Sequence, residues 1–163
     1  MDEDVILNLL ESATFENTPP FTLAGTTIKA RVLDVYDGDT MTVALPWKGS
    51  CYRFKLRLLG INTEELKGID AETKERALKA RDRLLDLVTC GDFKPDGPKC
   101  PRKLCRQALS AKPYLVTVQC HDFDKYGRVL ARVLCPGSQT ITLSDVLVQE
   151  GLAREYMVTT KTD

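Results

Sequence analysis

Apolar and polar residues alternate in five short runs of the chain, which is the pattern of β-strands with one buried face. These runs lie at residues 28–32, 41–45, 52–58, 114–120 and 128–135. Between the third and fourth runs, residues 70–88 change to a helical period, with apolar side chains every three or four positions. The sequence therefore predicts an α+β fold, mainly β, in which helices pack on a five-stranded OB-fold-like barrel.

The two ends of the chain differ from this central part. Residues 1–24 carry five acidic and no basic side chains, and their apolar residues fall at helical spacing before Pro19-Pro20. They predict an acidic N-terminal arm or a short amphipathic helix. We expect residues 25–158 to form one domain and residues 159–163 a tail, because a chain of 163 residues is long enough for one core but short for two.

Two further segments complete the predicted domain. Residues 90–113 are rich in Cys, Pro and Lys, and we expect them to form a solvated loop inserted between the long helix and the fourth strand. A last helix is expected around Leu147, with Ser144 or Asp145 as its N-cap and Gly151 at its end.

Charge and hydropathy exclude several classes of protein. Lys plus Arg and Asp plus Glu number 23 each, so the chain has no overall basic field, although residues 90–113 hold six basic side chains against two acidic ones. The chain does not open with positive residues followed by an apolar run, and no stretch approaches the roughly 18 to 20 apolar residues of a membrane span. We expect an intracellular protein without membrane contact, and a monomer.

The six cysteines allow two interpretations. Without a secretory signal, free thiols are favoured over disulfides. Cys90, Cys100 and Cys105, with His121, would also allow a Cys3His zinc site, but their spacing contains no CxxC pair. Because His121 is the only histidine, catalytic triads and multi-histidine metal sites are excluded.

Four polar stretches interrupt the strand pattern: Asp37 with Asp39, Arg57, residues 62–65, and residues 124–128. Asp37-Gly38-Asp39 alone predicts only a hairpin turn, in which glycine takes the positive φ that such turns need. Arg57 alternates with the apolar side chains of its strand, so it must be solvated or paired. Carboxylates suit a hard cation and arginines suit phosphate. Both are what phosphodiester cleavage needs.

The runs DGDTMTV, FKLRLLGINTEE, DKYGRVLA and LVQEGLA together resemble staphylococcal nuclease and the thermonuclease-like family in order and spacing. The resemblance spans about residues 27–156, interrupted by residues 90–113. It implies a metal-dependent endonuclease that cuts single-stranded or unpaired DNA or RNA. It also implies Ca²⁺ as the cofactor, with Mg²⁺ or Mn²⁺ as alternatives.

The resemblance also assigns roles to individual positions. Its two phosphate-binding arginines fall on Arg57 and Arg128, and its general base falls on Glu65. Its metal ligands fall on the following residues: Asp39, Asn62 and Thr63, with Asp37 as a nearby acid. Its nucleotide contacts fall on the following residues: Lys125, Tyr126 and Tyr156.

Two positions depart from the family pattern. Asn62 stands where the family usually has Asp, and Glu64 stands where it has Pro. An amide keeps an oxygen ligand but removes one negative charge, which lowers affinity for Ca²⁺. Glu64 would restore that charge if its side chain turned inward. The alternative to a nuclease is therefore a catalytically inactive module that binds nucleic acid or acts as a scaffold. A third hypothesis is an interaction module that uses the acidic arm and residues 90–113.

Overall fold

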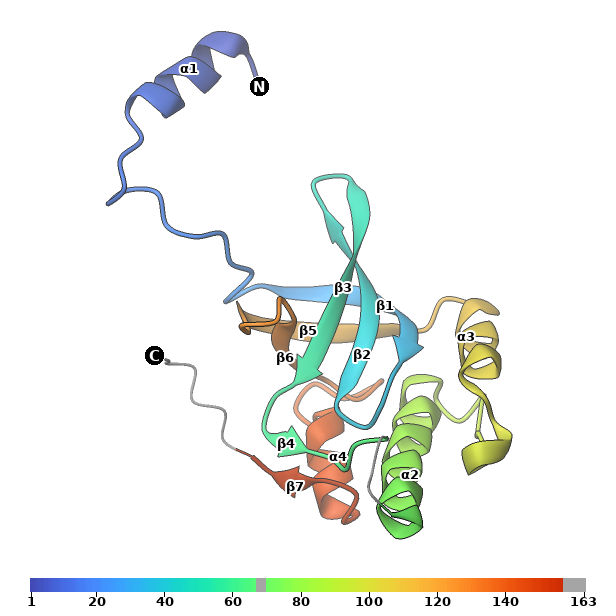
Figure 1. The fold of residues 1–163 in the computed structure, drawn as a ribbon. Helices are drawn as coiled ribbons and strands as arrows, with labels where there is room; N and C mark the ends of the chain where they lie inside the picture. Colours follow the sequence, from blue (N-terminus) through green and yellow to red (C-terminus); the bar gives the residue numbers. More distant parts are fainter. Residues whose placement is uncertain (67–69, 157–163) are drawn as a thin grey trace.

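Five strands close into a barrel in the computed structural model, which describes residues 1–66 and 70–156 (Figure 1). The strands are β1 (Thr27–Val35), β2 (Thr40–Trp47), β3 (Ser50–Leu58), β5 (Leu115–Phe123) and β6 (Val129–Val133). Their order around the barrel is β1-β2-β3-β6-β5, with β3 and β6 parallel and the other pairs antiparallel. The predicted OB-fold-like α+β barrel is confirmed.

Alternation along the strands builds the core as the sequence predicts. Inward-facing residues of four strands, among them Val32, Val43, Leu56 and Val118, are completely buried. The next strand, β4 (Ile61–Asn62), pairs outside the barrel with β7 (Arg154–Glu155), a short ladder that the sequence did not reveal. Two-residue strands carry too little alternation to be recognised from a pattern of period two.

Helix α2 (Ala71–Val88) lies where the helical period predicts it. Asp70 caps it by accepting a hydrogen bond from the Thr73 amide at 2.7 Å. The predicted apolar stripe is buried: Ala77, Leu78, Ala80, Leu84, Leu85 and Val88. This packing fixes α2 beside the turn between β1 and β2.

The expectation of a loop over residues 90–113 is wrong. The segment contains a 3-10 turn, η1 (Gly97–Lys99), and a helix, α3 (Arg102–Ser110). Cys105 and Leu109, four residues apart, are both buried, so α3 is an amphipathic helix packed on the barrel. The abundance of Cys, Pro and Lys concealed a helical period that spans only two turns.

The N-cap predicted for the last helix is also wrong. The N-cap of helix α4 (Leu143–Gln149) is Thr142, two residues before Ser144 and three before Asp145, in a capping box where Thr142 and Asp145 each accept from the other's backbone amide. Ser144 instead donates to the Leu59 carbonyl at 2.8 Å and ties α4 to the segment that leaves β3.

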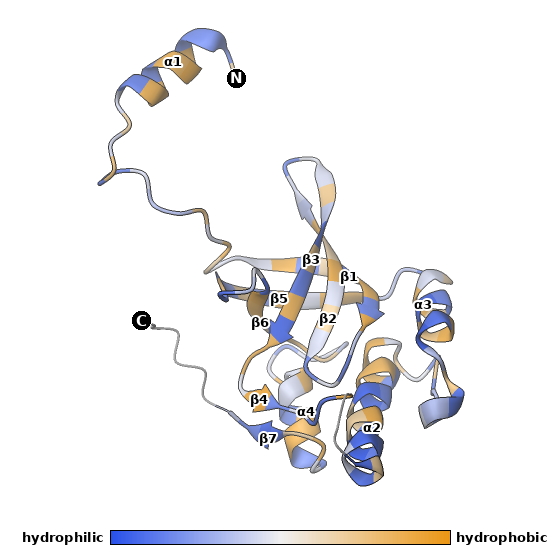
Figure 2. Ribbon diagram, viewed as in Figure 1, coloured by the Kyte–Doolittle hydropathy of each residue, from blue (hydrophilic) through white to orange (hydrophobic). Residues whose placement is uncertain are grey.

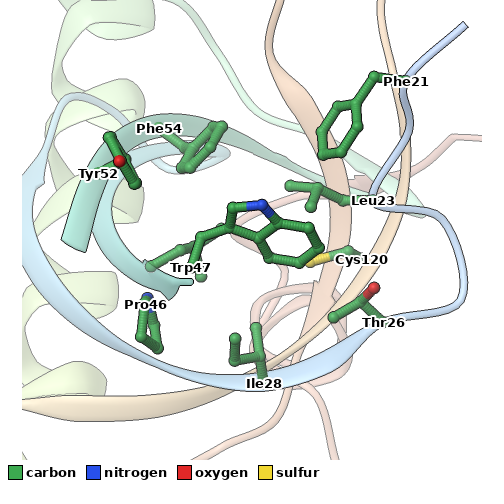
Figure 3. A pocket seen from close by; sticks show the side chains of 10 residues that line it. Phe21, Leu23, Thr26, Ile28, Pro46, Trp47, Tyr52, Phe54 and Cys120 are labelled. Atoms are coloured by element: carbon green, nitrogen blue, oxygen red, sulfur yellow. The ribbon is translucent and has the colours of Figure 1, made fainter. Parts of the chain in front are cut away.

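The N-terminal arm contacts the barrel beside Trp47 of β2. Helix α1 (Glu3–Glu11) has no buried residue and lies away from the barrel in Figure 1. Farther along the arm, Phe21 meets Trp47 edge to face, with ring centroids 5.7 Å apart. The two rings belong to an apolar pocket of about 270 Å³, in which Figure 3 shows the indole surrounded by Phe21, Leu23 and Phe54. The pocket therefore lies where the N-terminal arm packs against the barrel. No helix within residues 1–66 and 70–156 is long and apolar enough to cross a bilayer.

Candidate active site

The turn between β1 and β2 is held by close packing against its neighbours. Gly38 does not take the positive φ that the hairpin interpretation required, so that part of the expectation is wrong. A Cβ on Gly38 would lie 2.6 Å from the Ala80 Cβ of α2 and 2.8 Å from the Thr63 Cγ2. Glycine is needed because the turn is pressed between α2 and residue 63. This contact fixes where the flanking carboxylates point.

Asp39 is 7% exposed, and its carboxylate accepts three hydrogen bonds. Its Oδ2 accepts hydrogen bonds from the Thr63 amide at 3.0 Å and from the Thr63 hydroxyl at 3.1 Å. Its Oδ1 accepts from the Thr40 hydroxyl at 3.1 Å. A carboxylate with these donors is fixed in orientation.

Asp37 lies beside Asp39, and the two carboxyl groups repel each other when both are ionised. The Asp37 Oδ1 accepts from the Asp39 amide at 3.1 Å. Burial, followed by repulsion from the neighbouring Asp39 carboxylate, raises the pKa of Asp37 to about 7. The pair therefore disfavours a second negative charge at neutral pH, which is the situation that a bound cation would relieve.

Arg57 lies on β3 opposite Thr40 and is 8% exposed. Its Nη2 donates to the Asn62 Oδ1 at 3.1 Å and lies 3.5 Å from the Asp39 Oδ2. Its Nη1 donates to the Leu58 carbonyl at 2.7 Å. Of the two possibilities that the sequence left open, solvated or paired, the structure shows a paired arginine, and its partners occupy both terminal nitrogens.

The segment after β3 sends its two glutamates to different places. Glu65 is exposed and lines the same groove as Asp39 and Arg57. Glu64 pairs instead with Arg76 at 3.5 Å and with Arg154 at 3.6 Å. Glu64 is not among the groove residues, so the idea that it restores a charge to the expected metal site is wrong.

The DKYGR stretch forms the opposite wall of the groove. The Asp124 Oδ1 accepts from the amides of Tyr126 and Arg128, both at 2.9 Å, while its Oδ2 accepts from the Arg128 Nε at 2.7 Å. Burial alone would raise the pKa of Asp124, but these hydrogen bonds outweigh it and lower the pKa. The chain turns at Gly127, whose φ is +81°. Arg128 is thus anchored through Nε alone.

One groove of about 930 Å³ collects all ten site residues named from the sequence. They are Asp37, Asp39, Arg57, Asn62, Thr63, Glu65, Lys125, Tyr126, Arg128 and Tyr156. Tyr156 reaches it because its amide donates to the Gly60 carbonyl at 2.9 Å, next to the β4–β7 ladder. The sequence interpretation missed Tyr36, Asp124 and Phe123, which also line the groove. Asp124 begins the DKYGR motif and could have been recognised as the partner of Arg128.

The donor set fits a hard cation held weakly. Asp37 and Asp39 offer carboxylate oxygens whose mutual repulsion a cation would relieve, and Asn62 and Thr63 add neutral oxygens. Among residues 1–66 and 70–156, no three His, Cys, Asp or Glu side chains gather as a metal site. Any cation here would therefore keep several waters. The Cys3His zinc interpretation is not supported either, since only Cys100 and Cys105 approach each other, with sulfurs 3.4 Å apart.

Comparison with known proteins agrees with the fold. Residues 98–163 match the family model described as staphylococcal nuclease homologue. The matched part includes DKYGR, β5, β6 and α4 but not the DGD turn, Arg57 or Glu65. No curated protein matches the chain. The resemblance is therefore confirmed for residues 98–163, and the closed five-stranded barrel is consistent with the OB-fold-like architecture that the resemblance implies.

Proposed function

We propose that the chain is a metal-dependent nuclease that hydrolyses phosphodiester bonds of single-stranded or unpaired DNA or RNA. The observation that carries the proposal is the groove itself, which brings together two carboxylates, two arginines and Glu65 from four separate stretches of the chain. Such a set can neutralise a phosphate, take a proton from water and stabilise the charge of the transition state.

Asp39 and Asp37, with oxygens of Asn62 and Thr63, would hold the cation. Ca²⁺ is the first choice because the site is irregular and rich in oxygen, and Mg²⁺ or Mn²⁺ are the alternatives. Bound there, the cation would supply positive charge that neutralises the phosphate.

Glu65 is the proposed general base. Its exposed carboxylate at the groove can take a proton from the water that attacks phosphorus. A new P–O bond forms, the bond to the leaving oxygen breaks, and that oxygen takes up a proton. The Arg128 Nη atoms donate no hydrogen bond within the described residues and are available to the phosphate oxygens.

Aromatic and basic side chains at the groove suit an unpaired strand. Lys125 and Arg128 both lie over the Tyr126 ring, at 5.2 and 5.5 Å from its centroid, and Tyr126 is 72% exposed. Tyr156 adds a second exposed ring. Exposed rings bordered by cations bind splayed bases by stacking.

Two adjacent glutamates provide a matched test. Glu65→Gln should lower the rate of oligonucleotide cleavage by about 10²-fold or more, because it removes the proton acceptor. Glu64→Gln removes the same charge one residue away, outside the groove, and should stay within a few-fold of wild type. Cleavage should require Ca²⁺, Mg²⁺ or Mn²⁺ and stop in EDTA. Equal activity of the two variants would refute the role of Glu65.

The second candidate is an inactive module that binds nucleic acid without cutting it. The bond from Arg57 to the Asn62 amide oxygen favours it, because an oxygen that accepts from an arginine is not free to bind a cation. This candidate predicts that wild type binds oligonucleotides and cuts none of them in any of the three metals.

A further inference from the structure

The outward side of strands β1, β2 and β3 is basic, and it starts at the groove. Side chains alternate along a strand, so Arg53 and Lys55 point to the same side of β3 as Arg57, at intervals of about 7 Å. Both are exposed, whereas Leu56 between Lys55 and Arg57 is fully buried. We call this side the basic face. It consists of Lys29, Arg31, Arg53 and Lys55 with Arg102 and Arg106 of α3.

Strand register aligns the cations in two rows. Ala44 on β2 lies opposite Arg31 on β1 and opposite Arg53 on β3. Thr42 likewise lies between Asp34 and Lys55. Ala44 therefore has a cation on both sides, whereas Thr42 has Lys55 on one side and Asp34 on the other.

Helix α3 extends this surface and joins it to the groove. Arg102 and Arg106 both donate to the Asp34 Oδ2, at 2.7 and 3.1 Å, so two cations share one carboxylate. The Arg102 guanidinium also lies 4.8 Å from the centroid of Tyr36, a residue of the groove. The basic face thus meets the groove at Tyr36 and at Arg57.

The charge of this surface is not neutralised from within. Asp34 is the only acidic residue in β1, β2, β3 and α3. Lys29, Arg31, Arg53 and Lys55 form no ion pair with any residue in the described ranges. The Arg31 Nε is buried without a hydrogen-bond partner in that part of the chain. Figure 2 shows the resulting hydrophilic patches on β3 and α3. Rows of unpaired cations attract a polyanion.

We propose that the basic face binds the phosphates of a single-stranded polynucleotide that continues out of the groove along β3. The proposal rests on the proposed function in placing the reacting phosphate beside Arg57, but binding along the face does not require cleavage. Arg53 and Lys55 hold the next phosphates of the strand, and Arg31 and α3 provide the second row of cations. The protein therefore prefers long strands to short ones.

Length-dependent binding tests the basic face. Fluorescence anisotropy in EDTA, where cleavage should not occur, compares oligothymidylate of about 12 nucleotides with a dinucleotide. Arg53→Ala/Lys55→Ala should weaken binding of the long strand about tenfold and reduce the slope of log K against log salt by about 1.4. Lys74→Ala/Lys94→Ala is the control. It removes two exposed charges from α2 and the following segment, and should bind like wild type.

The outcomes separate the two proposals. Equal affinities of the two double variants for the long strand, or an equal loss for the long strand and the dinucleotide, would overturn the basic face. If wild type cuts nothing but the Arg53/Lys55 variant still loses the long strand selectively, the face stands and the nuclease assignment fails. Circular dichroism of both variants establishes that a loss is not due to unfolding.

Discussion

The two arginines of the groove have the same chemistry but different surroundings. Arg57 is 8% exposed, and both its terminal nitrogens have protein partners. The Arg128 side chain is 30% exposed and bonds to Asp124 through Nε, and its terminal nitrogens donate no hydrogen bond within the described residues. Arg128 is therefore ready to meet a phosphate, whereas Arg57 must first exchange Asn62 or Asp39 for it. Arg57 contributes to the fold as well as to the site, and Arg128 mainly to the site.

The largest expected effect comes from removing each arginine. Arg57→Ala and Arg128→Ala should each lower cleavage by about 10²- to 10³-fold, because each removes charge that stabilises the transition state. Arg57→Ala should also destabilise the fold by about 3–5 kcal/mol, since it leaves Asp39 buried without its cation, and Arg128→Ala should destabilise it less because the Arg128–Asp124 pair is more exposed. Chemical denaturation of both variants checks the difference. Equal destabilisation would show that the two surroundings do not differ in energy.

The carboxyls beside the two arginines give the stability opposite pH dependences: the lowered pKa of Asp124 beside Arg128 costs stability as pH falls, whereas the raised pKa of Asp37 near Arg57 costs stability as pH rises. The pKa of Asp37 is about 7 in the folded protein against 3.8 as the ordinary value, so between these pH values only the folded state holds the proton. The free energy of unfolding therefore falls as pH rises from about 4 to 7, by up to about 4 kcal/mol, and is level above. Asp37→Asn should remove this loss and be more stable than wild type at pH 8.

Thermal unfolding in EDTA at pH 5 and pH 8 checks the sign. The gain of the variant over wild type should be clearly larger at pH 8 than at pH 5. An equal difference between the two proteins at both pH values would mean that Asp37 is ionised in the folded state throughout.

A smaller effect is expected where the turn packs on α2. Gly38→Ala places a methyl group 2.6 Å from the Ala80 Cβ and should cost about 1–3 kcal/mol of stability. Ala80→Gly removes the opposing atom, so the double variant should lose less than the two single changes combined. Strictly additive losses, measured by denaturation, would show that the turn is not pressed against α2.

The barrel strands were easier to predict from the sequence than helix α3 or the packing of Gly38. Alternation gave the barrel strands because inward side chains such as Val43 and Leu56 must be buried. The α3 helix was missed because only Cys105 and Leu109 mark its buried side. The reason for Gly38 was missed because its contact with Ala80 joins residues 42 positions apart, and local turn preferences do not contain such contacts.

The residues of the candidate site could be predicted from the sequence, but their side-chain partners could not. Motif spacing named ten residues that line one groove, since each motif stands where a strand begins or ends. Spacing could not show that Glu64 turns toward Arg76 and Arg154 while Glu65 faces the groove. Nor could it show that Arg57 bonds to Asn62, because side-chain partners are chosen in three dimensions.

The groove is proposed to be a working nuclease site in which Asn62 lowers the affinity for the cation and accepts a hydrogen bond from Arg57. Calcium-dependent cleavage by wild type and by Asn62→Asp tests this most directly. The rate of cutting of a labelled single-stranded oligonucleotide is followed against Ca²⁺ concentration for both proteins. We expect both proteins to cut, and the variant to reach half its maximal rate at a several-fold lower Ca²⁺ concentration because it adds one ligand charge. If neither protein cuts in Ca²⁺, Mg²⁺ or Mn²⁺ while both still bind the strand, the barrel is a binding module and the account is contradicted.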